Sequence, residues 1–129
     1  MMSKITIDKI QFYKDNNEKF SAITSYDFSS AKIIDSIDIP IVLVGDSASM
    51  MVYGYDTTIP VSMEEMLLVV RAVSRGATNS LVVADMPFLS YNSTPETVMP
   101  NGNKLSSVFN EVRNAFGHSH NCYIDICPN

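Results

Sequence analysis

Two short runs of branched apolar residues constrain the fold of this chain more than any other feature. The runs are "IPIVLVGD" (residues 39–46) and "SLVVAD" (residues 80–85), and neither shows an alternation of apolar and polar side chains. A strand without that alternation is typically buried on both faces, as in a parallel sheet covered by helices. Each run ends at an aspartate, Asp46 or Asp85. We therefore expect two parallel strands, each with an acidic residue at its carboxyl end.

Signals for further strands and helices lie on either side of these runs. "FSAIT" (residues 20–24) predicts a strand, and "SSAKIIDSI" (residues 29–37) has apolar residues at helical spacing. Ser62 and Glu65 have the spacing of a capping box, which predicts a helix from there to about residue 75. Strands that alternate with helices indicate βαβ units and a parallel sheet.

The last third of the chain continues the alternation with weaker signals. Thr94 and Pro95 fit the N-cap and first position of a helix, and "MPNGNK" (residues 99–104) predicts a turn. A helix is expected over residues 105–116 and a strand at "CYIDI" (residues 122–126). The predicted apolar face of that helix consists of Leu105, Val108, Phe109, Val112 and Phe116.

Composition excludes several classes of protein. The chain has 129 residues, 46% of them hydrophobic, which favours one compact domain. Its net charge of −5, with the basic residues scattered, argues against nucleic acid and membrane surfaces as partners. The amino-terminal residues are interrupted by charge, unlike a signal peptide, and no run approaches the roughly 20 apolar residues that span a bilayer. Together with only two cysteines, these features predict a cytoplasmic protein.

The two strand-end aspartates form a candidate site. In a parallel sheet the carboxyl ends of all strands lie at one edge, where sites of this fold class are found. Asp46 and Asp85, with Ser47 beside the first, would offer hard oxygen ligands to a cation such as Mg²⁺. The alternative is that each aspartate only caps the turn that follows its strand.

Four segments resemble the ketopantoate hydroxymethyltransferases, enzymes of pantothenate synthesis. They read "AITSYDFSSAKIIDS", "VLVGDSASMMVYGYDTTIPVSMEEML", "RAVSRGA" and "VVADMPFLSY", in the family's order and spacing. The resemblance runs from about residue 20 to about residue 96. It implies a partial (β/α)₈ barrel of the phosphoenolpyruvate mutase and isocitrate lyase type, comprising the first three to four β/α units.

The resemblance also implies roles for particular residues. By analogy Asp46 and Asp85 are ligands of Mg²⁺, Ser47 contacts the carboxylate of a 2-oxo acid, and Tyr26 and Asp27 lie close to the site. The loop with Asp56 and its two following threonines would help to form the mouth of the site, or would be a local turn. Asp46, Ser47, Asp85 and Tyr26 together are the expected substrate-binding residues.

The implied reaction transfers a hydroxymethyl group from 5,10-methylenetetrahydrofolate to 3-methyl-2-oxobutanoate, giving 2-dehydropantoate. The family also suggests a homo-oligomer. However, the family's "VKLEGG" segment and the glutamate that acts as general base are not found here, and a barrel of this kind takes about 250 residues. The sequence is therefore interpreted as one truncated barrel domain (residues 1–129), with an extension (1–19), a family-like core (20–98) and a divergent tail (99–129).

Several alternatives remain open for the tail and for the function. Asp125 and Tyr123 are the nearest positional substitutes for the missing metal-binding glutamate and lysine. His118, His120, Cys122 and Cys127 could bind zinc, although their spacing favours incidental positions in a loop. The chain could be a hydroxymethyltransferase that is inactive in isolation, a non-catalytic fragment or module that binds keto acid or metal, or a related Mg²⁺-dependent carbon–carbon lyase.

The sheet of half a barrel should also be exposed. We expect Val42, Val44 and Val82 to form the inner face of the barrel, without the side chains that normally fill its centre. That exposure predicts association or aggregation, unless the helix expected in the tail covers this face.

Overall fold

A computed structural model describes residues 3–88, 90, 99–101, 103–104, 106–108, 110 and 122–125. Its centre is a four-stranded sheet in which every neighbouring pair of strands is parallel. The strands are β1 (Ala22–Thr24), β2 (Ile41–Val44), β3 (Leu81–Asp85) and β4 (Cys122–Asp125), in the spatial order β1-β2-β3-β4. All four match strands that the sequence predicts.

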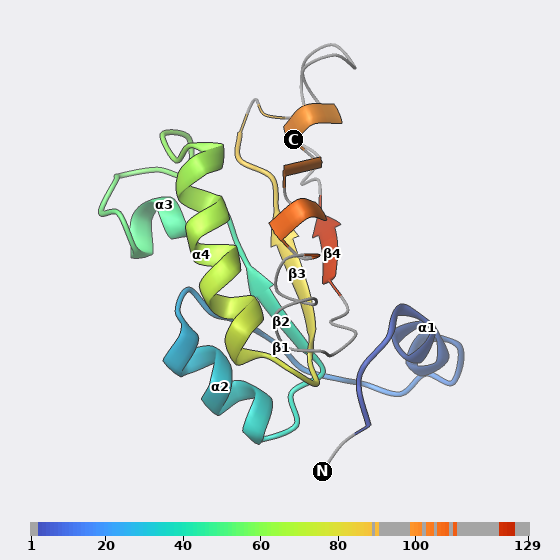
Figure 1. Cartoon of the computed structure of the whole chain (residues 1–129). Helices are drawn as coiled ribbons and strands as arrows, with labels where there is room; N and C mark the ends of the chain where they lie inside the picture. The colour runs from blue at the N-terminus through green and yellow to red at the C-terminus, as the bar shows by residue number, and fades with distance from the viewer. Residues whose placement is uncertain are drawn as a thin grey trace.

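The strand order identifies the type of α/β fold. Each described strand lies beside the strand that precedes it in the chain, whereas a doubly wound sheet reverses its order at a switch point. Figure 1 shows helices α2 (Phe28–Ser36) and α4 (Met63–Gly76) on one face of the sheet. Sequential parallel strands with their helices on one face are the arrangement of a (β/α)₈ barrel. The expected partial barrel is confirmed.

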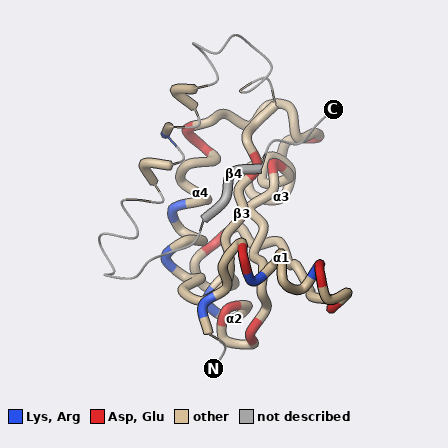
Figure 2. Tube along the Cα trace, turned by 90° about the vertical axis from the view of Figure 1, so that its right-hand side faces the viewer, with Lys and Arg blue, Asp and Glu red and all other residues tan. Residues whose placement is uncertain are grey.

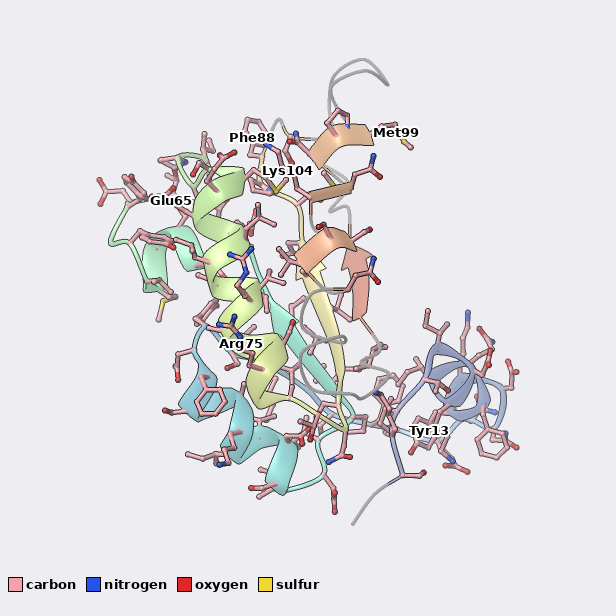
Figure 3. The ribbon with its side chains drawn as sticks, viewed as in Figure 1. Tyr13, Glu65, Arg75, Phe88, Met99 and Lys104 are labelled. Atoms are coloured by element: carbon pink, nitrogen blue, oxygen red, sulfur yellow. The ribbon has the colours of Figure 1, made fainter. Side chains whose placement is uncertain are left out.

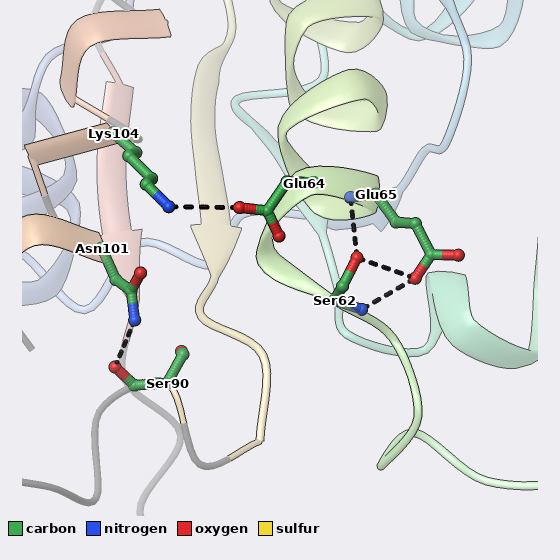
Figure 4. Close-up of polar contacts among 6 residues, drawn as sticks. All are labelled: Ser62, Glu64, Glu65, Ser90, Asn101 and Lys104. Atoms are coloured by element: carbon green, nitrogen blue, oxygen red, sulfur yellow. Dashed lines mark hydrogen bonds and ion pairs between the residues drawn. The ribbon is translucent and has the colours of Figure 1, made fainter. Parts of the chain in front are cut away.

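Local sequence explains where the two covering helices begin. Asp27 is the N-cap of α2 and accepts a hydrogen bond from the backbone N–H of Ser30 at 2.8 Å. At the start of α4 the capping box is complete, because Glu65 N–H donates to Ser62 Oγ at 3.2 Å and Ser62 N–H donates to Glu65 Oε2 at 2.8 Å (Figure 4). These bonds satisfy backbone donors that a helix leaves without partners in its first turn.

The hydrophobic core lies between the sheet and its helices, which corrects one expectation. Val42 and Val44 of β2 pair in register with Val82 and Ala84 of β3, and all four are buried in one cluster with side chains of α2 and α4. The prediction that these valines form the inner face of the barrel is therefore wrong. A run without polar alternation does not reveal which side chains face the helices. The helical members of the cluster include Ala31, Ile34, Met66, Val70 and Val73.

The described residues between positions 99 and 110 are helical. Residues 99–101, 103–104, 106–108 and 110 are helical, so the turn predicted for "MPNGNK" is wrong. A proline is tolerated in the first turn of a helix because its missing N–H would have no intrahelical partner there, and Pro100 follows the first described helical residue, Met99.

Three contacts join this helical segment to the body of the fold. Lys104 Nζ lies 3.1 Å from Glu64 Oε1 of α4, and Asn101 Nδ2 donates to the Ser90 carbonyl at 3.0 Å (Figure 4). Val108, predicted on the apolar face, is 3% exposed and belongs to the core cluster. The other four predicted apolar-face residues and the predicted cap at Thr94 and Pro95 lie outside the described residues.

The amino-terminal residues form a helix, α1 (Ile7–Asp15), for which the sequence analysis made no prediction. None of its residues is buried, and Tyr13 lies on the opposite side of the molecule from Glu65 and Arg75 of α4 (Figure 3). Just before α1, Ile5 is 1% exposed and its N–H donates to the Asn79 carbonyl at 2.8 Å. This contact attaches the segment to the body of the fold.

Charged residues occur on several elements of the described fold. Figure 2 shows acidic and basic residues interspersed along the trace. None of the helices within the described part of the chain is long and apolar enough to cross a membrane.

Candidate functional site

The carboxyl ends of three neighbouring strands bring the candidate site together. Tyr26 follows β1, Asp46 and Ser47 follow β2, and Asp85 is the last residue of β3. Because the strands are parallel, these positions share one edge of the sheet, toward which the arrows point in Figure 1. The structure thus places all four predicted site residues at the same edge.

Asp46 and Asp85 are in direct contact. The backbone N–H of Asp46 donates to Asp85 Oδ2 at 3.1 Å. Asp85 is 5% exposed, whereas Asp46 is half-buried. The carboxylate of Asp85 thus binds the backbone just after the end of the neighbouring strand, β2. The short helix α3 (Ala48–Met51) follows, and its N-cap residue, Ser47, makes no side-chain capping bond. Asp85 therefore makes a contact across strands besides any capping of its own following turn.

Ser47 and Tyr26 form a second polar contact at this edge. The Tyr26 hydroxyl lies 2.7 Å from Ser47 Oγ, and either oxygen can be the donor. Both residues are half-buried, so the pair can still be reached by a ligand. If Tyr26 donates, the Ser47 proton is free to bind an anionic group.

Gly45 is a site residue that the sequence analysis missed. A Cβ at this position would lie 2.8 Å from Ser47 Oγ and 3.5 Å from Asp85 Oδ2. The first distance is shorter than any ordinary contact, so a side chain at position 45 would displace the Ser47 hydroxyl. Its signal in the sequence is a glycine placed between a buried strand and an acidic residue.

The resemblance also placed Asp27 close to the site and the loop with Asp56 at its mouth. Asp27 is exposed and accepts hydrogen bonds from Ser30, through Ser30 Oγ at 2.6 Å and Ser30 N–H at 2.8 Å, which lower the pKa of the Asp27 carboxyl. In the loop after α3, Asp56 is exposed and Thr57 Oγ1 accepts from Ile59 N–H at 3.4 Å. The Thr57 contact is local, as the turn interpretation of this loop expects.

The side chains at this edge offer oxygen ligands that suit a hard divalent cation, but only two of them are carboxylates. Two carboxylates and two hydroxyls are the oxygen ligands that Mg²⁺ prefers. No group of three or more His, Cys, Asp or Glu suited to a metal occurs among the residues that the structure describes. The Cα of Asp125 in β4 pairs in register with that of Asp85, so the backbone of Asp125 occupies the position next along the edge.

The zinc alternative is not tested. His118, His120 and Cys127 lie outside the described residues, and only the backbone of Cys122 is described, in β4.

Comparison with known proteins gives one family. A family model described as ketopantoate hydroxymethyltransferase matches residues 4–119. The chain is 52% identical over 104 residues to a 3-methyl-2-oxobutanoate hydroxymethyltransferase of Caldicellulosiruptor bescii, which covers 81% of this chain and 39% of that protein. It is 47% identical over 97 residues to the protein of that name from Frankia alni, covering 75% of this chain and 32% of the relative. The chain thus spans about two-fifths or less of the length of these relatives.

A solved structure supports the fold. The chain superimposes on phosphonopyruvate hydrolase, solved in complex with oxalate and Mg²⁺, with a TM-score of 0.61 and 14% sequence identity. The match covers 77% of this chain and 34% of that one. At this identity the likeness supports the fold alone, and it agrees with a partial barrel.

Proposed function

The chain belongs to the ketopantoate hydroxymethyltransferase family, and on this basis we propose that it forms the part of a 3-methyl-2-oxobutanoate hydroxymethyltransferase that binds the keto acid and a metal ion. The proposed reaction joins the methylene carbon of 5,10-methylenetetrahydrofolate to C3 of the keto acid, with water supplying the hydroxyl oxygen, and gives 2-dehydropantoate and tetrahydrofolate. The observation that carries the proposal is the 3.1 Å contact between Asp46 N–H and Asp85 Oδ2, next to Ser47, at the carboxyl edge of the sheet.

In this proposal Asp46 and Asp85 hold Mg²⁺. The bound ion would act as a Lewis acid that polarises the ketone of the 2-oxo acid and acidifies its C3 proton. The Asp46 N–H keeps one oxygen of Asp85 occupied, so the hydrogen bond fixes the orientation of this carboxylate before a ligand arrives. A fixed carboxylate loses less conformational entropy on binding than a mobile one.

Ser47 and Tyr26 would orient the substrate. In this proposal the Tyr26 hydroxyl is the donor of the 2.7 Å bond to Ser47 Oγ, and the Ser47 hydroxyl would then donate to the carboxylate of the keto acid. Hydrogen bonds to charged groups are stronger than neutral ones, so this chain of two hydroxyls would favour an anionic ligand over a neutral ketone. No described residue is assigned as the general base.

The remaining expectations of the sequence analysis stay proposals. The family relationship supports a cytoplasmic location, a small 2-oxo acid as substrate, and assembly with further copies of the chain. A module that binds keto acid or metal without turnover is the second candidate, because the chain spans 39% of its relative from Caldicellulosiruptor bescii.

One set of measurements tests the proposal and separates the two candidates. The purified chain is titrated with MgCl₂ and with 3-methyl-2-oxobutanoate by calorimetry, and 2-dehydropantoate is assayed with 5,10-methylenetetrahydrofolate present. We expect binding that is lost in Asp46→Asn and Asp85→Asn, which remove charge and keep shape. The control is Asp15→Asn, an exposed position on α1. Binding without product would favour the module, and absence of both would overturn the proposal.

A further inference from the structure

A short helix directly after β2 sets the orientation of two proposed ligands. Ala48 N–H donates to the Gly45 carbonyl at 3.0 Å, and Ser49 N–H donates to the Asp46 carbonyl at 2.9 Å. Asp46 and Ser47 therefore belong to the same hydrogen-bonded turn as α3. Any tilt of α3 moves their backbone, and with it the Asp46 N–H that binds Asp85.

Ser49 ties this helix to the loop that follows it. Its side chain is 0% exposed, and its Oγ donates to the Thr57 carbonyl at 2.7 Å. In the other direction, Tyr55 N–H donates to the Ser49 carbonyl at 3.0 Å. One residue thus makes both a side-chain and a backbone hydrogen bond to the loop, at a position closed to water.

A second tie leads from the end of α3 to α4. The Tyr53 hydroxyl donates to the Glu65 carbonyl at 3.0 Å, and Glu65 is the residue that completes the capping box with Ser62. Helix α4 is itself packed on β2 and β3. These contacts therefore link α3 to a helix that is packed in the hydrophobic core.

We infer that Ser49 is a positioning residue that holds α3, and through it Asp46 and Ser47, in the geometry that binds metal and keto acid. The inference deepens the proposed function and rests on it. Ser49 itself would touch neither ligand. Ser49→Ala would remove the hydrogen bond to the Thr57 carbonyl, and with it the side-chain link between α3 and the loop.

The chain offers a matched control for this role. Ser74 in α4 is also a serine with 0% exposure, but its Oγ has no hydrogen-bond partner within the part of the chain that the structure describes. Ser74→Ala removes the same atom from an equally buried site without releasing a loop. The difference between the two variants therefore isolates the tie to Thr57 from the general effect of a buried Ser→Ala change.

The test reads the geometry directly, without any ligand. In ¹H–¹⁵N NMR spectra of the folded chain, we expect Ser49→Ala to move the amide proton of Asp46, which reports its bond to Asp85, and that of Ser47. We expect Ser74→Ala to leave both in place. If Ser49→Ala lowers the melting temperature but leaves the Asp46 and Ser47 amide resonances in place, Ser49 affects stability alone, and the inference is overturned.

A second readout uses Mg²⁺ alone as the probe. We expect Ser49→Ala to raise the Kd for Mg²⁺ about tenfold, the lower end of the loss seen when residues behind metal ligands are changed. Tyr53→Phe removes the other tie and should weaken binding in the same direction. Unchanged Kd values in both variants would refute the positioning role. If the wild-type chain does not bind Mg²⁺ but Ser49→Ala still moves the Asp46 amide, the proposed function fails and the structural role of Ser49 stands.

Discussion

Asp35 is predicted to be the most sensitive polar residue of the described fold outside the site. It lies in α2, is 7% exposed, and binds the turn that leads into β3. Its Oδ1 accepts from Asn79 N–H at 2.9 Å, Ser80 N–H at 2.8 Å and Ser80 Oγ at 2.9 Å. Its Oδ2 accepts from Thr78 Oγ1 and from Asn79 Nδ2, both at 3.0 Å. The carboxylate therefore joins α2 to β3 through five hydrogen bonds.

The effect of Asp35→Asn follows from this arrangement. The amide of asparagine keeps one acceptor oxygen, but its NH₂ group replaces the other oxygen and can only donate. At least the two hydrogen bonds to Oδ2 are therefore lost, and the donors of those bonds then face an NH₂ group. Hydrogen bonds to charged groups contribute about 1.5–3 kcal/mol each and are not additive. We expect Asp35→Asn to lower the free energy of unfolding by about 2–4 kcal/mol, a large fraction of the roughly 5–15 kcal/mol of a typical domain. Urea denaturation followed by circular dichroism measures this change.

The pH dependence provides an independent check on the same residue. Burial raises the pKa of Asp35, but hydrogen bonds from Ser80, Asn79 and Thr78 outweigh it, so the folded-state pKa lies below the ordinary value of 3.8. The unfolded state then binds the proton more readily. The contribution of Asp35 is present above pH 3.8 and is lost as the pH falls from there through the folded-state pKa. We expect Asp35→Asn to lose less stability than the wild type over this acid range.

Two results would refute this reasoning. One is a loss below about 0.5 kcal/mol in Asp35→Asn, the range of ordinary surface substitutions. The other is an acid-range slope equal to that of the wild type. Asp15→Asn, at an exposed position whose carboxylate accepts only a local bond from Gln11 Nε2 at 2.7 Å, is the matched control and should be near neutral.

Three further substitutions test the site and the frame that holds it. Tyr26→Phe removes the 2.7 Å contact with Ser47 and should weaken keto acid binding up to about tenfold, with a smaller effect on Mg²⁺, as measured by calorimetry. Gly76→Ala would place a Cβ 2.6 Å from the Phe28 carbonyl, so we expect a loss of about 1–3 kcal/mol in urea denaturation as α2 is pushed from α4. Ser62→Ala breaks the capping box and should cost about 1 kcal/mol in the same assay. A neutral result for Gly76→Ala or Ser62→Ala would contradict the packing or the cap, respectively.

Local sequence was sufficient where the physical cause lies within a few residues. The capping box at Ser62 and Glu65 predicted the start of α4, and the apolar runs predicted β2 and β3. "CYIDI" predicted β4, in spite of the weaker signal around it. The edge that Asp46 shares with Asp85 followed from the rule that parallel strands end together, and the sequential strand order from the barrel that the family resemblance implies.

Contacts between distant segments could not be predicted in this way. Asp35 meets its hydrogen-bond donors 43 to 45 residues away, and no local pattern marks them. Gly45 is required because Ser47 and Asp85 approach it in space. The face of β2 that holds Val42 and Val44 was assigned wrongly, because a strand that is apolar on both sides fits either orientation.

The sequence by itself determined the class of fold, the family, and the edge of the sheet at which the candidate site lies. Those properties depend on the spacing of apolar residues, on capping residues and on the order of the motifs, all of which can be read from residues that are close together in the sequence. Only the tertiary structure decided which strand residues face the helices, how Asp85 binds the backbone of Asp46, and that Ser49 ties α3 to its loop. The reason is that these features arise where segments far apart in the chain are packed to within hydrogen-bond distance, and burial then gives each contact its energetic weight.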